Sequence, residues 1–215
     1  MNNRIQKLNE YPFSRLKKLI CGTETGLLTP EIDFSIGEPK TERPKFIEKI
    51  LKDNIADISR YPSAKGITEL RASIADWATQ RYSLNNCYLD HEKHILPASG
   101  TRESLFGISQ ALYKSDPSKP YIDMPNPFYQ IYEGAAFLAG ATPVYLPCDG
   151  GNGFIPDFDA VPESVWKNCQ ILFLCSPGNP SGAVIPRETL VKVIELADQH
   201  DFLIASDECY SELYP

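Results

Sequence analysis

The chain has 215 residues, of which 42% are hydrophobic and 11% aromatic, and this apolar content excludes an intrinsically disordered protein. Its 21 basic and 28 acidic residues give a formal net charge of −7, which disfavours a nucleic-acid partner because the phosphate backbone is also negative. The six cysteines form no C-x-x-C pair, and the three histidines do not accompany them at zinc-finger spacing, so we expect reduced thiols and no metal site.

The first part of the chain is predicted to be mainly helical. Residues 1–42 show no alternation of helix and strand patterns, so we interpret them as an amino-terminal arm or a segment of a small domain, and residues 43–215 as the large domain. Apolar residues recur at helical spacing from Pro44 to Ile58 and again after Gly66. An extended piece over residues 94–97 precedes a helix that begins at Thr101.

Strand and helix patterns then alternate along the rest of the chain. The predicted strands cover residues 121–124, 142–146, 170–175 and 202–206, and the predicted helices cover 129–139 and 187–200. This alternation predicts an α/β fold with a mainly parallel sheet flanked by helices. Ligands of such sheets bind beyond the carboxyl ends of the strands, so the residues that follow each strand are the candidates for function.

A stretch of small residues leads into the helix that begins at Thr101. Ala98, Ser99 and Gly100 form this turn, and a helix start of this kind offers backbone N–H groups and a positive dipole end to a phosphate. The alternative is that Ser99 or Thr101 is simply the N-cap of the helix.

Two further strand ends carry polar residues. Asn179 lies in the centre of a loop with two prolines and two glycines, where it could contact a ligand or could adopt the left-handed conformation of a tight turn. Asp207 follows an apolar strand, and a carboxylate in such a place needs a partner, which could be a basic side chain, a metal ion or a protonated heterocyclic nitrogen.

Aromatic residues follow the strand at 121–124. Phe128 and Tyr129 lie on a proline-stiffened loop, where either ring could stack on a planar ligand or fill the core. A phosphate cradle, a stacking ring, an amide and a carboxylate together indicate a flat, phosphorylated, nitrogen-containing cofactor. Pyridoxal 5′-phosphate fits this description better than a dinucleotide, because no G-x-G-x-x-G motif follows an early strand.

Four motifs in this order resemble those of the fold-type I, class I/II pyridoxal-phosphate aminotransferases: Tyr61-x4-Gly66-x3-Leu70-Arg71, Gly100-Thr101, Asn179-Pro180-x-Gly182 and Asp207-x2-Tyr210. Residues 35–40, 124–136, 152–184 and 205–215 are similar to the bacterial N-succinyldiaminopimelate aminotransferases within that family. The resemblance implies the large cofactor domain of fold-type I, with an amino-terminal arm or part of the small domain before it.

The resemblance also implies roles for single residues. Asp207 would pair with the pyridine nitrogen, Asn179 and Tyr210 would bind the phenolic oxygen, and Asn179 would also face the substrate. Tyr129 would stack on the ring, with Phe128 as the other candidate. The phosphate would be held at Gly100, Thr101 and Arg102, and by Tyr61 of the neighbouring subunit, while the backbone at Gly37 would approach the substrate carboxylate.

The lysine that binds the cofactor covalently lies downstream of Asp-x-x-Tyr in this family, so we expect it beyond Pro215 and assign no catalytic residue in this chain. The expected activity is transfer of an amino group between glutamate and an N-succinylated amino-oxo acid in lysine and diaminopimelate synthesis. The alternatives are another pyridoxal-phosphate enzyme such as a carbon–sulfur lyase, a cofactor sensor fused to a DNA-binding module, and a non-catalytic fragment that binds the cofactor.

The partners and the compartment are expectations of the same kind. We expect amino acid and oxo acid substrates, a homodimer for the full-length protein, and neither nucleic acid nor membrane as a partner. The amino terminus lacks the apolar stretch of a signal peptide, and the longest apolar run, at 171–175, is too short to span a membrane. These features indicate a cytoplasmic protein.

Overall fold

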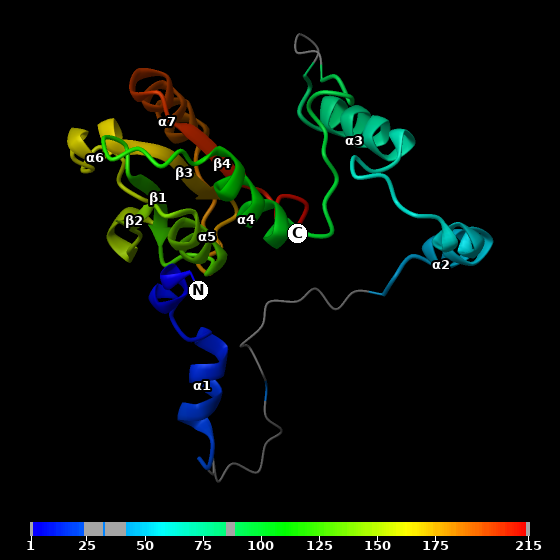
Figure 1. Cartoon of the computed structure of the whole chain (residues 1–215), viewed down its shortest axis with the longest axis horizontal. Helices are drawn as coiled ribbons and strands as arrows, with labels where there is room; N and C mark the ends of the chain where they lie inside the picture. The colour runs from blue at the N-terminus through cyan, green and yellow to red at the C-terminus, as the bar shows by residue number, and fades with distance from the viewer. Residues whose placement is uncertain (1, 24–31, 33–41, 85–88, 214–215) are drawn as a thin grey trace. The chain divides into compact units, whose positions relative to one another are not determined.

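The computed structural model describes residues 2–23, 32, 42–84 and 89–213 (Figure 1). They belong to two compact units: one, here called the sheet unit, combines Met1–Asn9 with Ala98–Pro215, and the other, the helical unit, is Glu10–Pro97. The predicted boundary between residues 42 and 43 does not coincide with the limits of either unit and stays a prediction.

The sheet unit contains four parallel strands in the order β2-β1-β3-β4. The strands are β1 (Tyr121–Asn126), β2 (Thr142–Pro147), β3 (Cys169–Cys175) and β4 (Leu203–Asp207). All four were predicted, with ends that differ by one or two residues, and the parallel α/β architecture is confirmed. The central strand β3 is buried along nearly its whole length, which explains why its sequence is continuously apolar and does not alternate.

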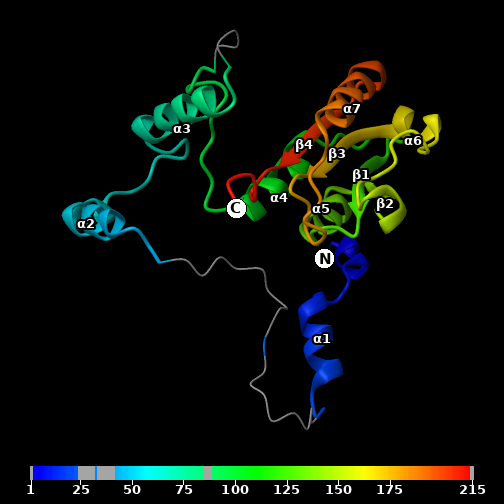
Figure 2. The same cartoon turned by 180° about the vertical axis from the view of Figure 1, so that it is seen from behind.

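Helices cover both faces of this sheet, as Figures 1 and 2 show. The helices are α4 (Thr101–Leu112), α5 (Ile131–Ala139), α6 (Glu163–Asn168) and α7 (Arg187–His200). Successive residues of β3 point to opposite faces, so Phe173 belongs to the core under α4 and α5, and Leu172 to the core under α6 and α7. The second core is centred on Trp166, whose ring stacks on Phe202 at 5.6 Å.

The first residues of the chain are attached to the end of α5. Within the short 3-10 helix η1 (Asn3–Lys7), Arg4 donates from Nη1 to the carbonyl oxygens of Leu138, at 3.2 Å, and Ala139, at 3.1 Å. Gly140 then ends α5 at φ +97°, and a Cβ at this position would lie 2.4 Å from Nη2 of Arg4. The glycine is therefore required both by the backbone conformation and by the space that Arg4 occupies.

The described residues of the helical unit form three helices and a short 3-10 turn: α1 (Pro12–Ile20), α2 (Lys45–Asp53), η2 (Ile55–Ser59) and α3 (Thr68–Arg81). The helix expected from Pro44 to Ile58 is in fact two elements, because α2 ends at Asp53 and the 3-10 turn begins at Ile55. Residues 94–97, where the sequence predicts a short extended piece, pair with no strand among the described residues.

The side chain of Arg71 holds part of the helical unit together. It is 4% exposed, donates to the carbonyl oxygens of Gly66 (2.8 Å) and His91 (3.3 Å), and forms an ion pair with Glu92. The Leu70-Arg71 part of the family motif therefore has a structural role here. None of the helices in the described ranges has the length and apolar character needed to cross a membrane.

Candidate cofactor site

The predicted cofactor residues converge on the carboxyl edge of the sheet. Gly100, Thr101, Arg102, Tyr129, Asn179, Asp207 and Tyr210 all belong to the sheet unit, and each lies in a loop, a helix start or a strand end. Tyr61 belongs to the helical unit and its side chain is 99% exposed. Gly37 lies outside the described residues.

Strand pairing sets the position of the Asn179 loop relative to Asp207. Cys175 and Asp207 are register partners at the ends of β3 and β4, and Ser176 N donates to the Asp207 carbonyl oxygen at 3.3 Å. The loop that carries Asn179 therefore begins beside Asp207. Gly178 and Gly182 close this loop through backbone hydrogen bonds, and Gly182 takes the left-handed conformation at φ +72°. The alternative in which Asn179 adopts that conformation is wrong.

Asp207 is a buried carboxylate, 4% exposed, and has two hydrogen-bond donors. The hydroxyl of Tyr132 donates to Oδ2 at 2.7 Å, and the backbone N–H of Cys209 donates to Oδ1 at 3.3 Å. A carboxylate has about four lone-pair positions, so these two bonds leave capacity for a further donor such as a pyridinium N–H. Among the described residues Asp207 forms no ion pair and joins no group that could bind a metal.

The aromatic residues before and within α5 form a contact series that ends at Asp207. Nε of Arg102 donates to the Tyr129 hydroxyl at 2.9 Å, and the Tyr129 ring meets the Tyr132 ring edge-on at 5.9 Å. Phe128 stacks instead on Tyr145 of β2, at 5.5 Å and 18°. Of the two candidates for stacking on the cofactor, Tyr129 is therefore the one in contact with other predicted site residues.

The start of α4 has the character expected of a phosphate site. Gly100 is the N-cap, and it provides no side-chain capping hydrogen bond, so the alternative of an ordinary cap by Ser99 or Thr101 is wrong. A Cβ on Gly100 would lie 2.7 Å from Oε2 of Glu103, which makes a side chain at this position unfavourable unless Glu103 moves. Backbone N–H groups and the helix dipole at this end are suited to an anion.

Several neighbours of Asp207 could not be identified from the sequence. Burial, followed by the Asp207 carboxylate, raises the pKa of the Cys209 thiol to about 12, and burial also raises the pKa of Cys175. The pKa of Tyr132 is raised far above its usual value by burial and by its hydrogen bond to Asp207. The signal that could have identified Tyr132 is its position three residues after Tyr129, one helical turn along.

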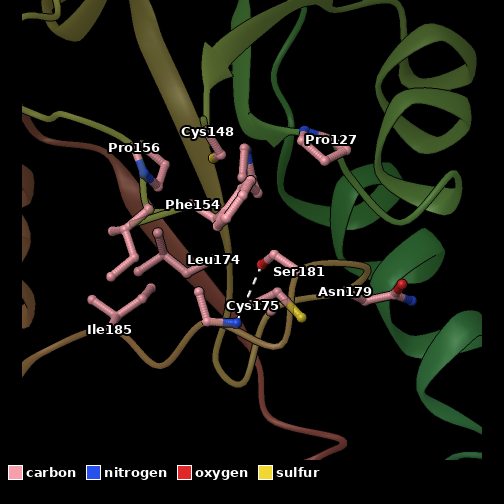
Figure 3. A pocket seen from close by; sticks show the side chains of 13 residues that line it. Pro127, Cys148, Phe154, Pro156, Leu174, Cys175, Asn179, Ser181 and Ile185 are labelled. Carbon is pink, nitrogen blue, oxygen red and sulfur yellow. Dashed lines mark hydrogen bonds between the residues drawn. The ribbon is translucent and has the colours of Figure 1, made fainter. Parts of the chain in front are cut away.

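A separate apolar pocket lies near the site (Figure 3). Its lining includes Pro127, Phe154, Leu174 and Ile185, and of the predicted cofactor residues only Asn179 belongs to the lining of this described pocket. Figure 3 shows the amide end of Asn179 pointing away from the other labelled side chains. The pocket lies at the carboxyl edge of the same sheet, because Pro125 of β1 and Cys175 of β3, the register partner of Asp207, also line it.

Two loop lysines could be considered as covalent cofactor ligands. Lys119 lies just before β1, at the amino edge of the parallel sheet, and its Nζ donates to the carbonyl oxygens of His200 and Asp201 at 2.9 Å each. Asp207 lies at the opposite, carboxyl edge, so Lys119 cannot reach it. Lys65 belongs to the helical unit. The structure thus assigns neither lysine to the site.

Comparisons with known proteins identify the family. The family described as aminotransferase class I and II matches residues 29–215. The LL-diaminopimelate aminotransferase of Desulforudis audaxviator is 31% identical over 214 residues, which are 98% of this chain and 52% of the relative. That of Halothermothrix orenii is 32% identical over 213 residues, covering 98% and 53%. These relatives are not named N-succinyldiaminopimelate aminotransferases, so the individual enzyme suggested by the sequence is not the one matched.

Solved structures of aminotransferases agree with this family assignment. An aminotransferase from Neisseria meningitidis Z2491 superposes with a TM-score of 0.90 at 40% identity, covering 100% of this chain and 54% of the other. Aminotransferase AspB from Helicobacter pylori 26695 gives 0.85 at 34% identity, covering 96% and 53%.

The chain thus spans about half the length of the relatives that it matches. Its fold is that of the fold-type I aminotransferases, whose family uses pyridoxal 5′-phosphate. Because the family match extends over most of its length, this chain belongs to the class I and II aminotransferases.

Proposed function

We propose that the full-length protein is a pyridoxal-phosphate-dependent aminotransferase acting on a substrate of the diaminopimelate class. The observation that carries this proposal is the buried carboxylate of Asp207, which has two hydrogen-bond donors, no cationic partner among the described residues, and a position at the carboxyl edge of the sheet. Its remaining hydrogen-bonding capacity suits the protonated nitrogen of a pyridine ring.

The other residues of the chain would bind and orient the cofactor. Thr101 and Arg102 would hold the phosphate through their backbone N–H groups beside Gly100, and Tyr129 would cover one face of the ring. Asn179 and Tyr210 would donate to the phenolic oxygen. When bound, the cofactor supplies an electron sink for the charge left at the substrate Cα when its proton departs, and Asp207 would strengthen that sink by keeping the ring nitrogen protonated.

Roles beyond the cofactor are proposals as well. Gly37 and Asn179 would face the substrate carboxylate, and Tyr61 would reach the phosphate of a second subunit, which requires a homodimer. The full exposure of the Tyr61 side chain in the chain described here is compatible with a role across a subunit interface. A cytoplasmic location remains an expectation from the sequence.

The substrate has two candidate forms. The names of the relatives favour LL-diaminopimelate itself, whereas the stretches 124–136 and 152–184 favour its N-succinyl derivative. The test is to supply the full-length protein with each amino donor and 2-oxoglutarate, and to measure glutamate formation. Turnover with one and not the other identifies the substrate. In a parallel reaction with a cysteine thioether, whose carbon–sulfur bond a lyase would cleave, release of pyruvate and ammonia without glutamate formation would show a lyase.

The assignment of the site has its own test. Asp207→Asn should bind pyridoxal phosphate more weakly and slow glutamate formation by at least tenfold, because a neutral amide stabilises a protonated ring less than a carboxylate does. Asp198→Asn, on the exposed side of α7, is the matched control and should behave as the wild type. Wild-type turnover in Asp207→Asn would contradict the proposed site.

A further inference from the structure

The hydroxyl group of Tyr132 is the shortest contact of Asp207. Tyr132 is 0% exposed, and its hydroxyl lies 2.7 Å from Oδ2 of Asp207, whereas the backbone N–H of Cys209 is 3.3 Å from Oδ1. A short hydrogen bond from a neutral hydroxyl to a carboxylate is of the strong, charge-assisted kind. The orientation of the Asp207 carboxylate therefore depends on Tyr132 more than on the backbone of its own loop.

Packing leaves the Tyr132 ring little freedom. One face stacks on Phe173 of β3 at 4.6 Å and 9°, and the edge-on contact with Tyr129 holds another side. The donor is thus held between a central strand and the residue proposed to cover the cofactor ring. A ring fixed in this way directs its hydroxyl at Asp207 before any ligand arrives, which is the condition for preorganisation.

The ionisable groups around Asp207 stay neutral over the pH range in which enzymes work. The pKa of Tyr132 is raised, first by burial and then by Asp207, and burial likewise raises the pKa values of Cys175, Cys209 and Tyr210. Arg102, which bonds Tyr129, keeps its charge throughout. A change in cofactor binding between pH 5.5 and 8.5 would therefore not come from the ionisation of these neighbours.

We propose that Tyr132 is a positioning residue of the cofactor site. Its hydroxyl holds the Asp207 carboxylate in the orientation that pairing with the ring nitrogen requires, and favours the charged form of that carboxylate. This inference rests on the proposed function, because it assumes that Asp207 meets that nitrogen. Tyr132 would act through Asp207 and would not itself touch the cofactor.

The test compares Tyr132→Phe, Asp207→Asn and the double variant with the wild type. The dissociation constant of pyridoxal phosphate is measured by absorbance titration of the purified full-length protein at several pH values from 5.5 to 8.5. Tyr145→Phe is the matched control, because it removes a similar hydroxyl–carboxylate bond, from Tyr145 to Glu133 at 2.6 Å, in the same unit but away from Asp207. Urea unfolding of each variant separates loss of affinity from loss of stability.

Tyr132→Phe should weaken cofactor binding about tenfold, the loss expected for a hydrogen bond to a charged group, and should make affinity fall more steeply toward acidic pH. Tyr145→Phe should leave affinity unchanged. In the Asp207→Asn background, Tyr132→Phe should have little additional effect, because both changes remove the same interaction. If Tyr132→Phe fails to fold, 3-fluorotyrosine at position 132 keeps the shape, strengthens the donor, and should tighten binding or leave it equal.

The outcomes distinguish the two proposals. No binding by the wild type, or equal binding by Asp207→Asn, contradicts the proposed function and this inference with it. If Asp207→Asn binds the cofactor weakly, but Tyr132→Phe has the affinity and the pH dependence of the wild type, the inference about Tyr132 is overturned and the proposed function is not. An equal loss from Tyr132→Phe in both backgrounds would also overturn the inference, since Tyr132 would then act independently of Asp207. Weaker binding by the 3-fluorotyrosine protein at neutral pH would likewise overturn it.

Discussion

Asp123 gives a quantitative prediction for the pH dependence of folding. It lies in the middle of β1 with 0% exposure, and neither carboxyl oxygen has a hydrogen-bond partner among the described residues. The thiol of Cys169 on the neighbouring strand is close but is a weak donor. Burial therefore raises the pKa of Asp123 from 3.8 to about 7, and the carboxyl is neutral in the folded protein below that pH.

The size of the effect follows from this difference. A shift of about three pKa units corresponds to about 4 kcal/mol at 1.36 kcal/mol per unit. Because the folded pKa is the higher one, this contribution to stability is fully present below pH 3.8, decreases as the pH rises, and is lost once the pH passes about 7. Between pH 5 and pH 8 the loss amounts to about 3 kcal/mol in the free energy of unfolding.

The assay is urea unfolding from pH 5 to pH 8, followed by the fluorescence of Trp166, which is buried in the sheet unit. The second tryptophan, Trp77, lies in the helical unit and is replaced by phenylalanine in all proteins compared. Asp123→Asn has no carboxyl to ionise. Between pH 5 and pH 8, its free energy of unfolding should therefore decrease by about 3 kcal/mol less than that of the parent protein. Asp198→Asn, an exposed control, should follow the parent. Parallel curves for Asp123→Asn and the parent would refute the reasoning.

Three further substitutions test other contacts. Arg71→Ala should destabilise the helical unit by about 2–4 kcal/mol in urea unfolding followed by Trp77 fluorescence, because it removes a buried ion pair and several hydrogen bonds to carbonyl groups. Arg71→Lys should lose less stability than Arg71→Ala. Wild-type stability in Arg71→Ala would contradict the role given to Arg71. Gly140→Ala should destabilise the sheet unit by about 1–3 kcal/mol, because of the positive φ at this position and the conflict of the new Cβ with Arg4. Gly153→Ala, at φ +65° with open space around it, should lose less stability. Tyr61→Phe should leave the unfolding curve unchanged, since the side chain is 99% exposed, but should weaken cofactor retention in a dimer; equal retention removes Tyr61 from the site.

The sequence predicted the regular parts of the sheet unit well, for identifiable reasons. The helix at Arg187–His200 has a strong helical period that begins after Pro186, and β3 before it is a continuous apolar run, so the limits of both agree closely with the structure. Helices α1 and α6 were not predicted. Helix α1 lies in residues 1–42, which were interpreted as an arm, and α6 has only six residues, too few for a clear apolar period.

The parts of the site that depend on tertiary contacts could not be predicted. The sequence placed Asp207 at a strand end, but the identity of its donor depends on how α5 packs against β4, 75 residues away along the chain. Asp123 is a buried acid within a strand, and the sequence contains no feature that distinguishes it from a residue on the exposed face of a half-buried strand. The break between α2 and η2 likewise follows no change in the apolar pattern.

The attachment of the first residues to the end of α5 has a consequence for synthesis of the protein. Arg4 bonds to carbonyl groups 134 and 135 residues later, and Asn9 donates to Glu133, so these contacts cannot form until the ribosome has released the whole of α5. The segment at the start of the chain is made first and docks late. During that interval the carbonyl groups at the end of α5 and the guanidinium of Arg4 both remain solvated by water. A bulky fusion placed directly before Arg4 would obstruct this late step and not the earlier assembly of the strands.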